Sequence, residues 1–378
     1  MIPEMADIAI RRCTADDETG VVSLLDTVFD GWPKFDLPVN NVDHWRWKYR
    51  DNRFSPFYAF VAEAGGQIVG FSGGISHSVK VSDAVVDGGI GCDVAVHPDF
   101  RSRGVWSKII DVFNEEASRK ERNFLHYMTG NPIVIKRMSK MRPKLPYSLS
   151  NMVRIRDIDA QLKAIPDESE WIKKIGFKIV KSVNALSGIK RKYSHRESEF
   201  DVRTVERFDS RVNLLWKKVS PSYNFIGKRD EDYLNWRYSD PRAGDFKITI
   251  AEDDASEVQG YVVSRVNRYI KDYPVGFVMD LVAVPRRLDV ADSLVNEAVN
   301  GFDAEGVNIV NYLNVSRHPY SSLMARYGFV NSMVKFNVFY NAPNLATEFE
   351  ALRKAVPSSI FFSWGDHDSL PLGTKKIL

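Results

Sequence analysis

Cysteine is scarce in this chain of 378 residues, which contains only Cys13 and Cys92. Two isolated cysteines exclude a disulfide framework and a CxxC metal site, and they favour a reducing compartment. Long apolar runs are missing too: no stretch of 18 apolar residues is present, and the segment MIPEMADIAIRR has no apolar core of the signal-peptide type. We therefore expect a cytoplasmic protein with no membrane partner.

A strong excess of charge of one sign is also missing. The 52 basic and 49 acidic residues leave a formal charge of +3 at pH 7, which gives no reason to expect a nucleic-acid partner. The sequence has no HExxH or clustered His and Cys, no GxxxxGK[ST], and no GxGxxG after a first strand. We expect no metal, and any phosphate site must use another motif.

What the chain does have is an internal repeat. DHWRWKYRDNR at 43–53 matches DYLNWRYSDPR at 232–242 in five identical residues, each pair 189 positions apart, and VAVHP at 94–98 resembles VAVP at 282–285. With 44% hydrophobic residues, the chain is long enough for two cores. We interpret it as two copies of one domain, with boundaries at 1–199 and 200–378.

Each copy has the same predicted order of elements. A short strand leads into an amphipathic helix, the Trp-Tyr segment and a strand pair, which in the first copy turns at Gly65-Gly66. A buried strand, a loop, a long helix, a strand and a further helix follow. This order predicts an α/β fold, with a mixed sheet layered by helices in each copy. The segment with FKIVKSVNAL and KRKYSHRE is expected to complete the first domain and link it to the second.

The Trp-Tyr segment recurs in both copies. Trp47 and Tyr49 correspond to Trp236 and Tyr238. A pair kept in both copies favours a role in the core over stacking on a substrate.

The loop in HPDFRSRGVWSKI, residues 97–109, follows the apolar strand CDVAV and precedes the helical pattern SKIIDVFNEEASRK. A helix N-terminus offers unpaired N–H groups and partial positive charge to an anion. Gly104 allows a ligand to approach the backbone, and Arg101 and Arg103 can pair with phosphate. A pyrophosphate is the ligand that this loop suits.

The order strand, R-x-x-G-x, helix resembles the GNAT acetyltransferase superfamily, and the start IRRCTADD, the hairpin AEAGGQIVGF and DVAVHPDFRSRG fall in family order. The resemblance implies two tandem GNAT-like domains with mostly antiparallel sheets, and acetyl-CoA as co-substrate. It implies that these residues bind the cofactor: Val94, Ala95, Val96, Arg101, Ser102, Arg103, Gly104, Val105, Trp106, Ser107 and Asn131. Trp106 departs from the family, which usually has Gly or Ala there. The second copy reads VAVPRRLDVADSLV, without the glycine, and we expect that it has lost the CoA site.

Acyl transfer to an amine needs a base, and in the family this is often a carboxylate on the splayed strand or an ordered water. Asp93 is the carboxylate on that strand and our candidate base, although Asp280 near the equivalent point of the second copy favours a structural role. The family's usual acid tyrosine is replaced by Met138. Tyr127 and Tyr147 are the substitutes, with Tyr127 the candidate acid and water the alternative.

The predicted function is an N-acetyltransferase that moves acetyl from acetyl-CoA to a small-molecule amine; an amino sugar is an acceptor suggested by analogy. Trp32 and Phe35, in FDGWPKFD, either border the acceptor pocket or anchor their loop. Two alternatives stay open: another acyl or aminoacyl transferase on a double GNAT fold, and a non-catalytic CoA-binding pair. The C-terminal half is expected to help wall the acceptor pocket.

Overall fold

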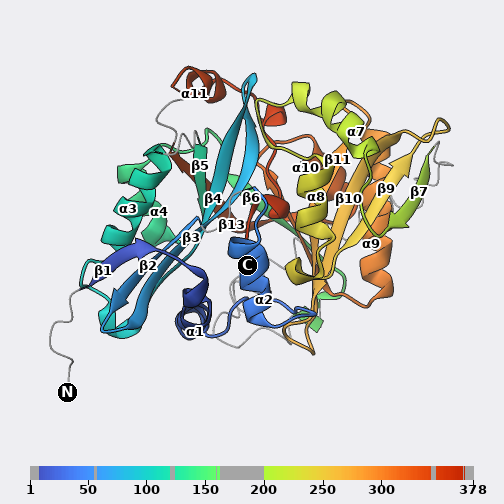
Figure 1. Ribbon diagram of the computed structural model, residues 1–378. Coiled ribbons are helices and arrows are strands. Elements are labelled where there is room, and N and C mark those ends of the chain that lie inside the picture. Colours follow the sequence, from blue (N-terminus) through green and yellow to red (C-terminus); the bar gives the residue numbers. More distant parts are fainter. Residues whose placement is uncertain are drawn as a thin grey trace.

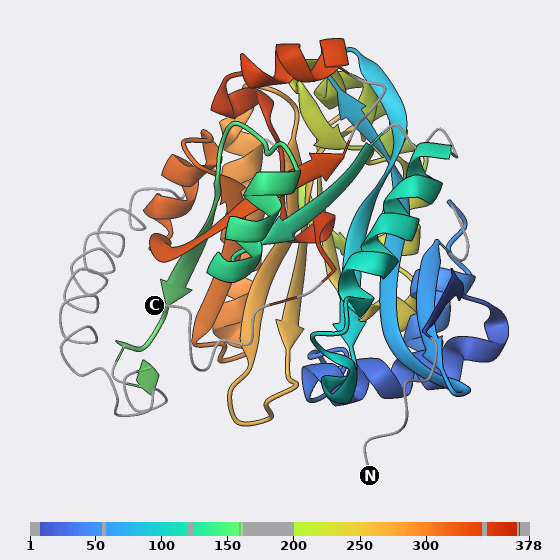
Figure 2. The ribbon, with the colours of Figure 1, turned by 90° about the vertical axis from the view of Figure 1, so that its left-hand side faces the viewer.

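The computed structural model describes residues 8–54, 58–119, 124–158, 160–161, 200–341, 346–368 and 370. Its strands form one twisted sheet that runs through the whole molecule, with helices on both faces (Figures 1 and 2). The predicted strand at 177–186 and the basic run at 190–197 lie outside the described residues. None of the helices described is long and apolar enough to cross a membrane.

The two halves of the chain have the same order of elements. The first half contains β1 (Ala9–Arg12), α1 (Glu18–Phe29), α2 (Asn41–Trp45) with a π-helical turn (Arg46–Arg50), β2 (Ala59–Ala64), β3 (Gln67–Val81), β4 (Ala84–Val96), α3 (Val105–Arg119), β5 (Phe124–Thr129), α4 (Pro132–Met141) and β6 (Leu149–Ile155). The second contains β7 (Asp201–Val205), α7 (Arg211–Val219), β8 (Phe225–Gly227), α8 (Glu231–Tyr238), β9 (Lys247–Glu252), β10 (Val258–Asn267), β11 (Val275–Ala283), α9 (Leu288–Ala304), β12 (Ile309–Val315), α10 (Tyr320–Arg326), β13 (Val330–Asn341) and α11 (Ala346–Arg353). Apart from β8 and α11, each element of the second half has a counterpart in the first.

The sheet has the strand order β1-β2-β3-β4-β5-β13-β6-β12-β11-β10-β9-β7, and β8 pairs with β3. Among the strands that the structure describes, β4–β5 and β11–β12 pair in parallel and the other neighbours are antiparallel. The predicted fold class, two tandem domains with mixed and mostly antiparallel sheets, is confirmed.

The last strand of each half lies in the sheet of the other half. β6 pairs with β12, with Leu149 opposite Val315, and β13 pairs with β5, with Val338 opposite Met128. β6 and β13 also pair with each other at the centre of the molecule. The sheet is therefore continuous across the two halves that the repeat defines in the sequence.

Glycine sets the distance between helix and sheet at the same point of each half. A Cβ on Gly70 of β3 would lie 2.7 Å from Ile109 of α3, and one on Gly260 of β10 would lie 2.9 Å from Val290 of α9. Because successive residues of a strand face opposite sides, Phe71, next to Gly70, points away from α3 and packs edge-on against Tyr49. The helices α3 and α9 thus cover equivalent faces of the two halves.

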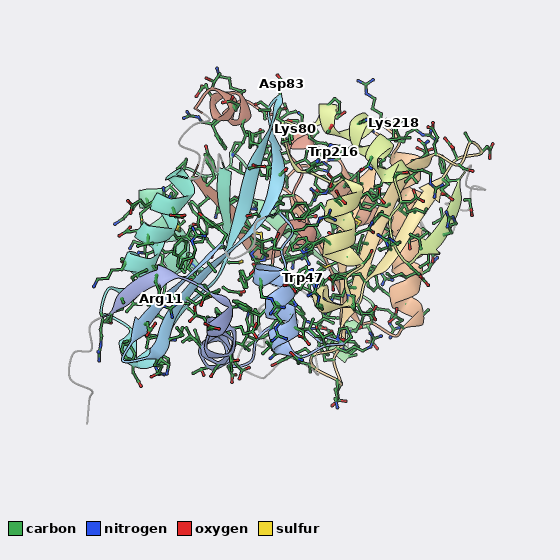
Figure 3. The ribbon with its side chains drawn as sticks, viewed as in Figure 1. Arg11, Trp47, Lys80, Asp83, Trp216 and Lys218 are labelled. Atoms are coloured by element: carbon green, nitrogen blue, oxygen red, sulfur yellow. The ribbon has the colours of Figure 1, made fainter. Side chains whose placement is uncertain are left out.

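The Trp-Tyr segments of the repeat meet between the halves. Trp47, labelled in Figure 3, lies where the π-helical turn after α2 faces α8. Trp47, Tyr49, Trp236 and Tyr238 are all at most 8% exposed, as the expected core role requires.

Candidate functional site

The neighbouring strands β4 and β5 separate midway along β4. Their parallel pairing joins Gly88–Ile90 to Phe124–His126. Beyond Ile90, β4 continues to Val96 along β3, whereas β5 pairs on its other side with β13. Main-chain groups on the facing edges of β4 and β5 are then available to a ligand. This separation matches the splayed strand that the family resemblance implies.

A cavity of about 750 Å³ lies at the separation of the strands. Its walls are β4 and β5, the loop at Gly31–Phe35, helix α4 and the C-terminal segment at His367–Asp368. Most of the lining side chains are apolar, and the volume falls within the range of small-molecule sites, ~300–1,000 Å³. The site therefore suits a largely apolar ligand with a few polar groups.

The Arg-Gly loop begins beside this cavity. Arg101, Ser102, Arg103 and Gly104 are all exposed, and α3 starts directly after them at Val105. Gly104 has a φ of 76°, which favours glycine, and a Cβ there would meet no atom within 4 Å. The backbone at Gly104 is therefore not covered by any neighbouring side chain of the described residues.

Trp106 connects the loop to the cavity, because its side chain lines it. The guanidinium of Arg137 on α4 lies 3.8 Å from the centre of the Trp106 ring and donates to Ser107 Oγ at 3.0 Å. Trp106 and Arg137 thus form part of the wall between α3 and α4. Asn131 caps α4 by accepting from the N–H of Ile133 at 2.9 Å, and it is not among the described residues that line the cavity.

Asp93, the candidate base, has three hydrogen-bond donors. Its Oδ1 accepts from Trp32 Nε1 at 2.9 Å, and its Oδ2 accepts from Lys48 Nζ at 2.5 Å and Tyr49 OH at 2.6 Å. Asp93 also has a φ of 49°, and the β3–β4 register shifts beside it. Both carboxylate oxygens therefore already accept hydrogen bonds from these donors. Trp32 thus both donates a hydrogen bond to Asp93 and lines the cavity.

Lys48 links Asp93 to the C-terminal segment. Its ammonium group lies 3.1 Å from Oδ2 of Asp368, and the Lys48 side chain is 3% exposed. Burial by itself would lower the pKa of Lys48, but the two carboxylates outweigh burial and raise it above its ordinary value. The same ion pair outweighs burial at Asp368 and lowers the pKa of that carboxyl. Lys48 therefore stays charged at the edge of the cavity.

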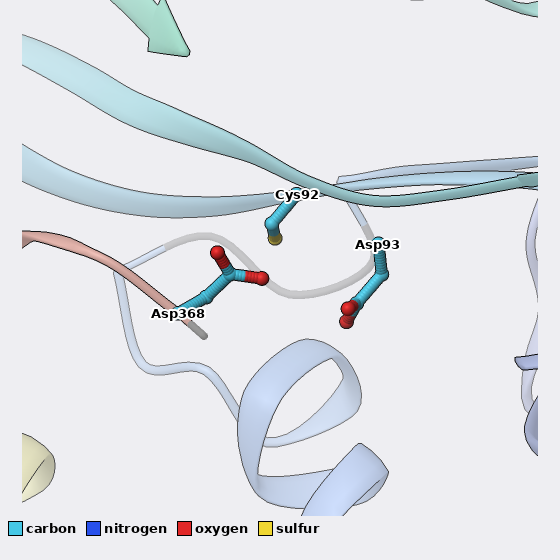
Figure 4. Close-up of side chains that lie close together, drawn as sticks. All are labelled: Cys92, Asp93 and Asp368. Atoms are coloured by element: carbon cyan, nitrogen blue, oxygen red, sulfur yellow. The ribbon is translucent and has the colours of Figure 1, made fainter. Parts of the chain in front are cut away.

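Cys92, Asp93 and Asp368 come close enough together to suggest a metal site (Figure 4). The ammonium of Lys48 already supplies a positive charge to both carboxylates. Burial raises the pKa of the Cys92 thiol well above its ordinary value, so the sulfur stays protonated. We interpret the cluster as an ion-pair site centred on Lys48.

The second half contains an equivalent ion-pair cluster. Asp280 of β11 accepts from Arg229 at 3.0 Å and from Tyr261 at 3.1 Å, and Arg229 also binds Asp366 at 2.7 Å. In both halves a buried cation binds two carboxylates, one from a strand and one from the C-terminal segment. Because such a cluster occurs in both halves, Asp93 also has a structural role.

Tyr127 of β5 is placed across the strand separation. Its ring packs over Gly91, where a Cβ would lie 1.9 Å from Cε1, and its hydroxyl has no hydrogen-bond partner among the residues that the structure describes. Burial raises the pKa of Tyr127 above its ordinary value, so the hydroxyl remains a neutral donor. Tyr127 and Met138 both line the cavity, whereas Tyr147 donates to the main-chain oxygen of Ala355 at 3.1 Å.

The equivalent loop of the second half is shorter and carries side chains. It spans residues 284–287, against 97–104 in the first half, and α9 starts at Leu288. Asp289, in the first turn of α9, pairs with Arg287 at 2.8 Å. A carboxylate at this helix end repels phosphate and neutralises the nearby arginine.

Three residues of the site have no signal in the sequence. Lys48 lies inside the repeat but its counterpart is Arg237, and His367 and Asp368 belong to a segment without a motif. All three depend on contacts across the fold: Lys48 and Asp368 are 320 residues apart. A buried lysine needs an acidic partner, yet the sequence does not indicate which one.

Comparison with known proteins gives a domain match for residues 9–130 and a fold for most of the chain. Residues 9–130 match the family model described as an acetyltransferase (GNAT) domain, and no curated protein matches the chain. The fold resembles that of N-myristoyltransferase from Saccharomyces cerevisiae with bound myristoyl-CoA, at a TM-score of 0.59, 12% identity, and coverage of 90% of this chain and 80% of that one.

Two bacterial structures are similar in the same way. A GCN5-related N-acetyltransferase from Anabaena variabilis has a TM-score of 0.58 at 10% identity, covering 90% of this chain and 74% of that one. A probable N-acyltransferase of unknown function from Enterococcus faecalis has a TM-score of 0.58 at 8% identity, covering 88% and 72%. Residues 9–130 thus match a GNAT acetyltransferase domain, and most of the chain shares its fold with these structures.

Proposed function

We propose that the chain is an acyl-CoA-dependent N-acyltransferase, which moves an acetyl group from acetyl-CoA to the amine of a small molecule. The observation that carries this proposal is the cavity where β4 and β5 separate, with the Arg-Gly loop beside it at the start of α3. The cavity supplies a place for the thioester and the amine, and the loop supplies cations and open backbone for a pyrophosphate.

In this proposal each part of CoA has its own contacts. Arg101, Ser102, Arg103, Gly104 and the first turn of α3 bind the pyrophosphate. The main chain of Val94–Val96 binds the pantetheine arm along the exposed edge of β4, and Asn131 adds an amide at the start of α4. Trp106 and Ser107 line the route from loop to cavity. Arg137, which rests on Trp106, adds a cation to this end of the site.

The reaction itself needs little covalent chemistry from the protein. The amine attacks the thioester carbonyl carbon, the carbonyl oxygen gains negative charge, and the carbon–sulfur bond then breaks. Tyr127 offers a neutral hydroxyl close to the strand separation. We assign it the donation of a hydrogen bond to the departing sulfur. Asp93 contributes a fixed negative charge beside the amine.

A second candidate, a transferase for acyl groups longer than acetyl, is favoured by the apolar face of α4. Ile133 is 80% exposed and Met141 45% exposed, and both line the cavity. Apolar side chains open to solvent at a cavity mark a ligand site. The Saccharomyces cerevisiae protein of the same fold was solved with myristoyl-CoA. A chain of several methylene groups would cover this face, whereas an acetyl group would not.

We assign the acceptor to the class of small-molecule amines, with an amino sugar as the first to be tried. The loop with Trp32 and Phe35 lines one side of the acceptor pocket, and the C-terminal half supplies the His367–Asp368 wall. Cys13 and Cys92 are both buried and unpaired, which supports a reducing compartment such as the cytoplasm.

Isothermal titration calorimetry with free CoA, acetyl-CoA, octanoyl-CoA and myristoyl-CoA tests both candidates. We expect acyl-CoA to bind with one site per chain. If the cavity holds the acyl chain, affinity should rise with length by up to about fourfold per buried methylene, from ~0.8 kcal/mol each. Affinity independent of length supports acetyl transfer. No binding of any member contradicts the proposal, and binding without transfer to any amine supports a non-catalytic CoA-binding pair.

A further inference from the structure

The carboxylates of the cavity are poorly placed to take a proton from the acceptor amine. Asp93 has donors on both oxygens, from Trp32, Lys48 and Tyr49. One carboxylate oxygen of Asp368 accepts a hydrogen bond from Lys48 Nζ. Protonating either carboxylate would disrupt the ion pair and leave the buried ammonium of Lys48 with one counter-charge fewer, which is unfavourable. The base has to be sought elsewhere on the cavity wall.

His367 lies on that wall, in the C-terminal segment. Its Nε2 is 3.6 Å from Oδ1 of Asp368, and its side chain is 13% exposed. One oxygen of Asp368 therefore faces Lys48 while the other faces the imidazole. A carboxylate that orients an imidazole, whose second nitrogen handles the proton, is a general arrangement in acyl transfer.

The cluster beside His367 contains more carboxylates than cations. Asp93 and Asp368 surround the single ammonium group of Lys48. A proton taken up during the reaction by a base next to this cluster is therefore placed beside carboxylate oxygens.

The main chain holds His367 in place. Arg237 of α8 donates to the His367 main-chain oxygen at 2.9 Å. His126 of β5, on a neighbouring strand, has its pKa lowered to about 3 mainly by burial, so it is neutral at working pH. Among the described residues, Asp368 and Arg237 are charged groups that lie against His367.

We propose that His367 is the general base of the acyl transfer and that Asp368 positions it. This inference rests on the proposed function. The amine nitrogen bonds to the carbonyl carbon of the thioester, the carbon–sulfur bond breaks, and the amine proton goes to the imidazole. The thiolate of CoA takes up one proton from water, and the imidazolium returns one to water, so protons and charge balance.

The test compares the variants His367→Gln and Asp93→Asn with the wild type. CoA release from acetyl-CoA or octanoyl-CoA is measured with a panel of primary amines and amino sugars between pH 6 and pH 10. In His367→Gln we expect the rate near pH 7 to fall ~100-fold or more, the usual scale of general-base help. Part of the loss should return at high pH, where more of the amine is free. The Kd for acyl-CoA should stay within about twofold, because the imidazole is not assigned to the cofactor.

Two further variants separate catalysis from folding. Asp368→Asn should lose less activity and move the acid limb of the pH–rate profile to lower pH, because a neutral amide no longer favours the imidazolium. Lys218→Gln, at an exposed side chain of α7 far from the cavity lining, should match the wild type.

The outcomes distinguish the inference from the function on which it rests. A His367→Gln variant with full activity at pH 7, or an Asp93→Asn variant that alone loses the acid limb, would overturn the role of His367 and leave the function standing. A wild-type protein that binds acyl-CoA but acylates no amine of the panel would overturn the function itself.

Discussion

Trp47 stacks on Trp236, its own counterpart in the internal repeat. The ring centroids are 4.7 Å apart with an angle of 17° between the planes, and Trp47 Nε1 donates to the main-chain oxygen of Trp236 at 3.0 Å. A residue that packs on its own repeat equivalent marks an approximate two-fold relation between the halves, as in an isologous dimer. The exchange of β6 and β13 at the centre of the sheet follows the same relation.

Removing the Trp47 ring should therefore destabilise both halves together. We expect Trp47→Ala to lower the free energy of unfolding by ~3–5 kcal/mol, because it leaves a cavity between the halves and removes the stack. Urea unfolding followed by circular dichroism measures the change. Trp216→Ala, at a half-buried tryptophan of α7, is the control and should cost less. Two separate unfolding transitions in the wild type would contradict a single cooperative unit.

The Arg-Gly loop can be tested by reversing its charge. The double variant Arg101→Glu, Gly104→Asp should abolish acetyl-CoA binding in calorimetry and leave the fold intact, because both positions are exposed. Two carboxylates facing a pyrophosphate repel it, and an aspartate at a φ of 76° is strained as well. An unchanged Kd would remove this loop from the binding site.

Arg287→Glu is the matched change in the second half. Arg287 already pairs with Asp289, so we expect no effect on acyl-CoA affinity and a stoichiometry of one per chain in both wild type and variant. A wild-type stoichiometry of two, reduced to one by this change, would mean that the second loop still binds CoA.

Acid should weaken the fold through its buried histidines. Burial lowers the pKa of His44 and His126 to about 3 and that of His77 and His318 to about 4, against 6.5 for an exposed histidine. Between about pH 6.5 and pH 4 the unfolded chain binds protons that the native chain does not. The free energy of unfolding then falls as pH falls, by ~1.4 kcal/mol per pH unit for each such proton.

Urea unfolding at pH 7, 6 and 5 measures this slope. His44→Gln removes one of the titrating groups, and its slope should be smaller by about one proton even if the variant is less stable at pH 7. Equal slopes for wild type and variant would show that His44 is protonated in the native state.

The repeat, the order of elements and the Arg-Gly loop can all be read from the amino-acid sequence alone. These depend on local patterns: the apolar periodicity of strands and helices, a glycine at a left-handed backbone position, and arginines next to a helix start. The same patterns predicted that the second loop has lost the CoA site, since it has no glycine and is followed by Asp289. They also placed Asp93 and Tyr127 on the strands that line the cavity.

Which strands share a sheet, and which charged side chains meet, became known from the three-dimensional fold. β6 and β13 have ordinary strand patterns, and nothing in them indicates that each pairs with the opposite half. The sequence has 49 acidic residues. Lys48 pairs with two of them, Asp93 and Asp368, because folding buries all three side chains together. A buried ion pair requires a partner in space and sets no spacing along the chain. His367 and Asp368 could therefore be recognised as part of the site only after the C-terminal segment was placed against β4.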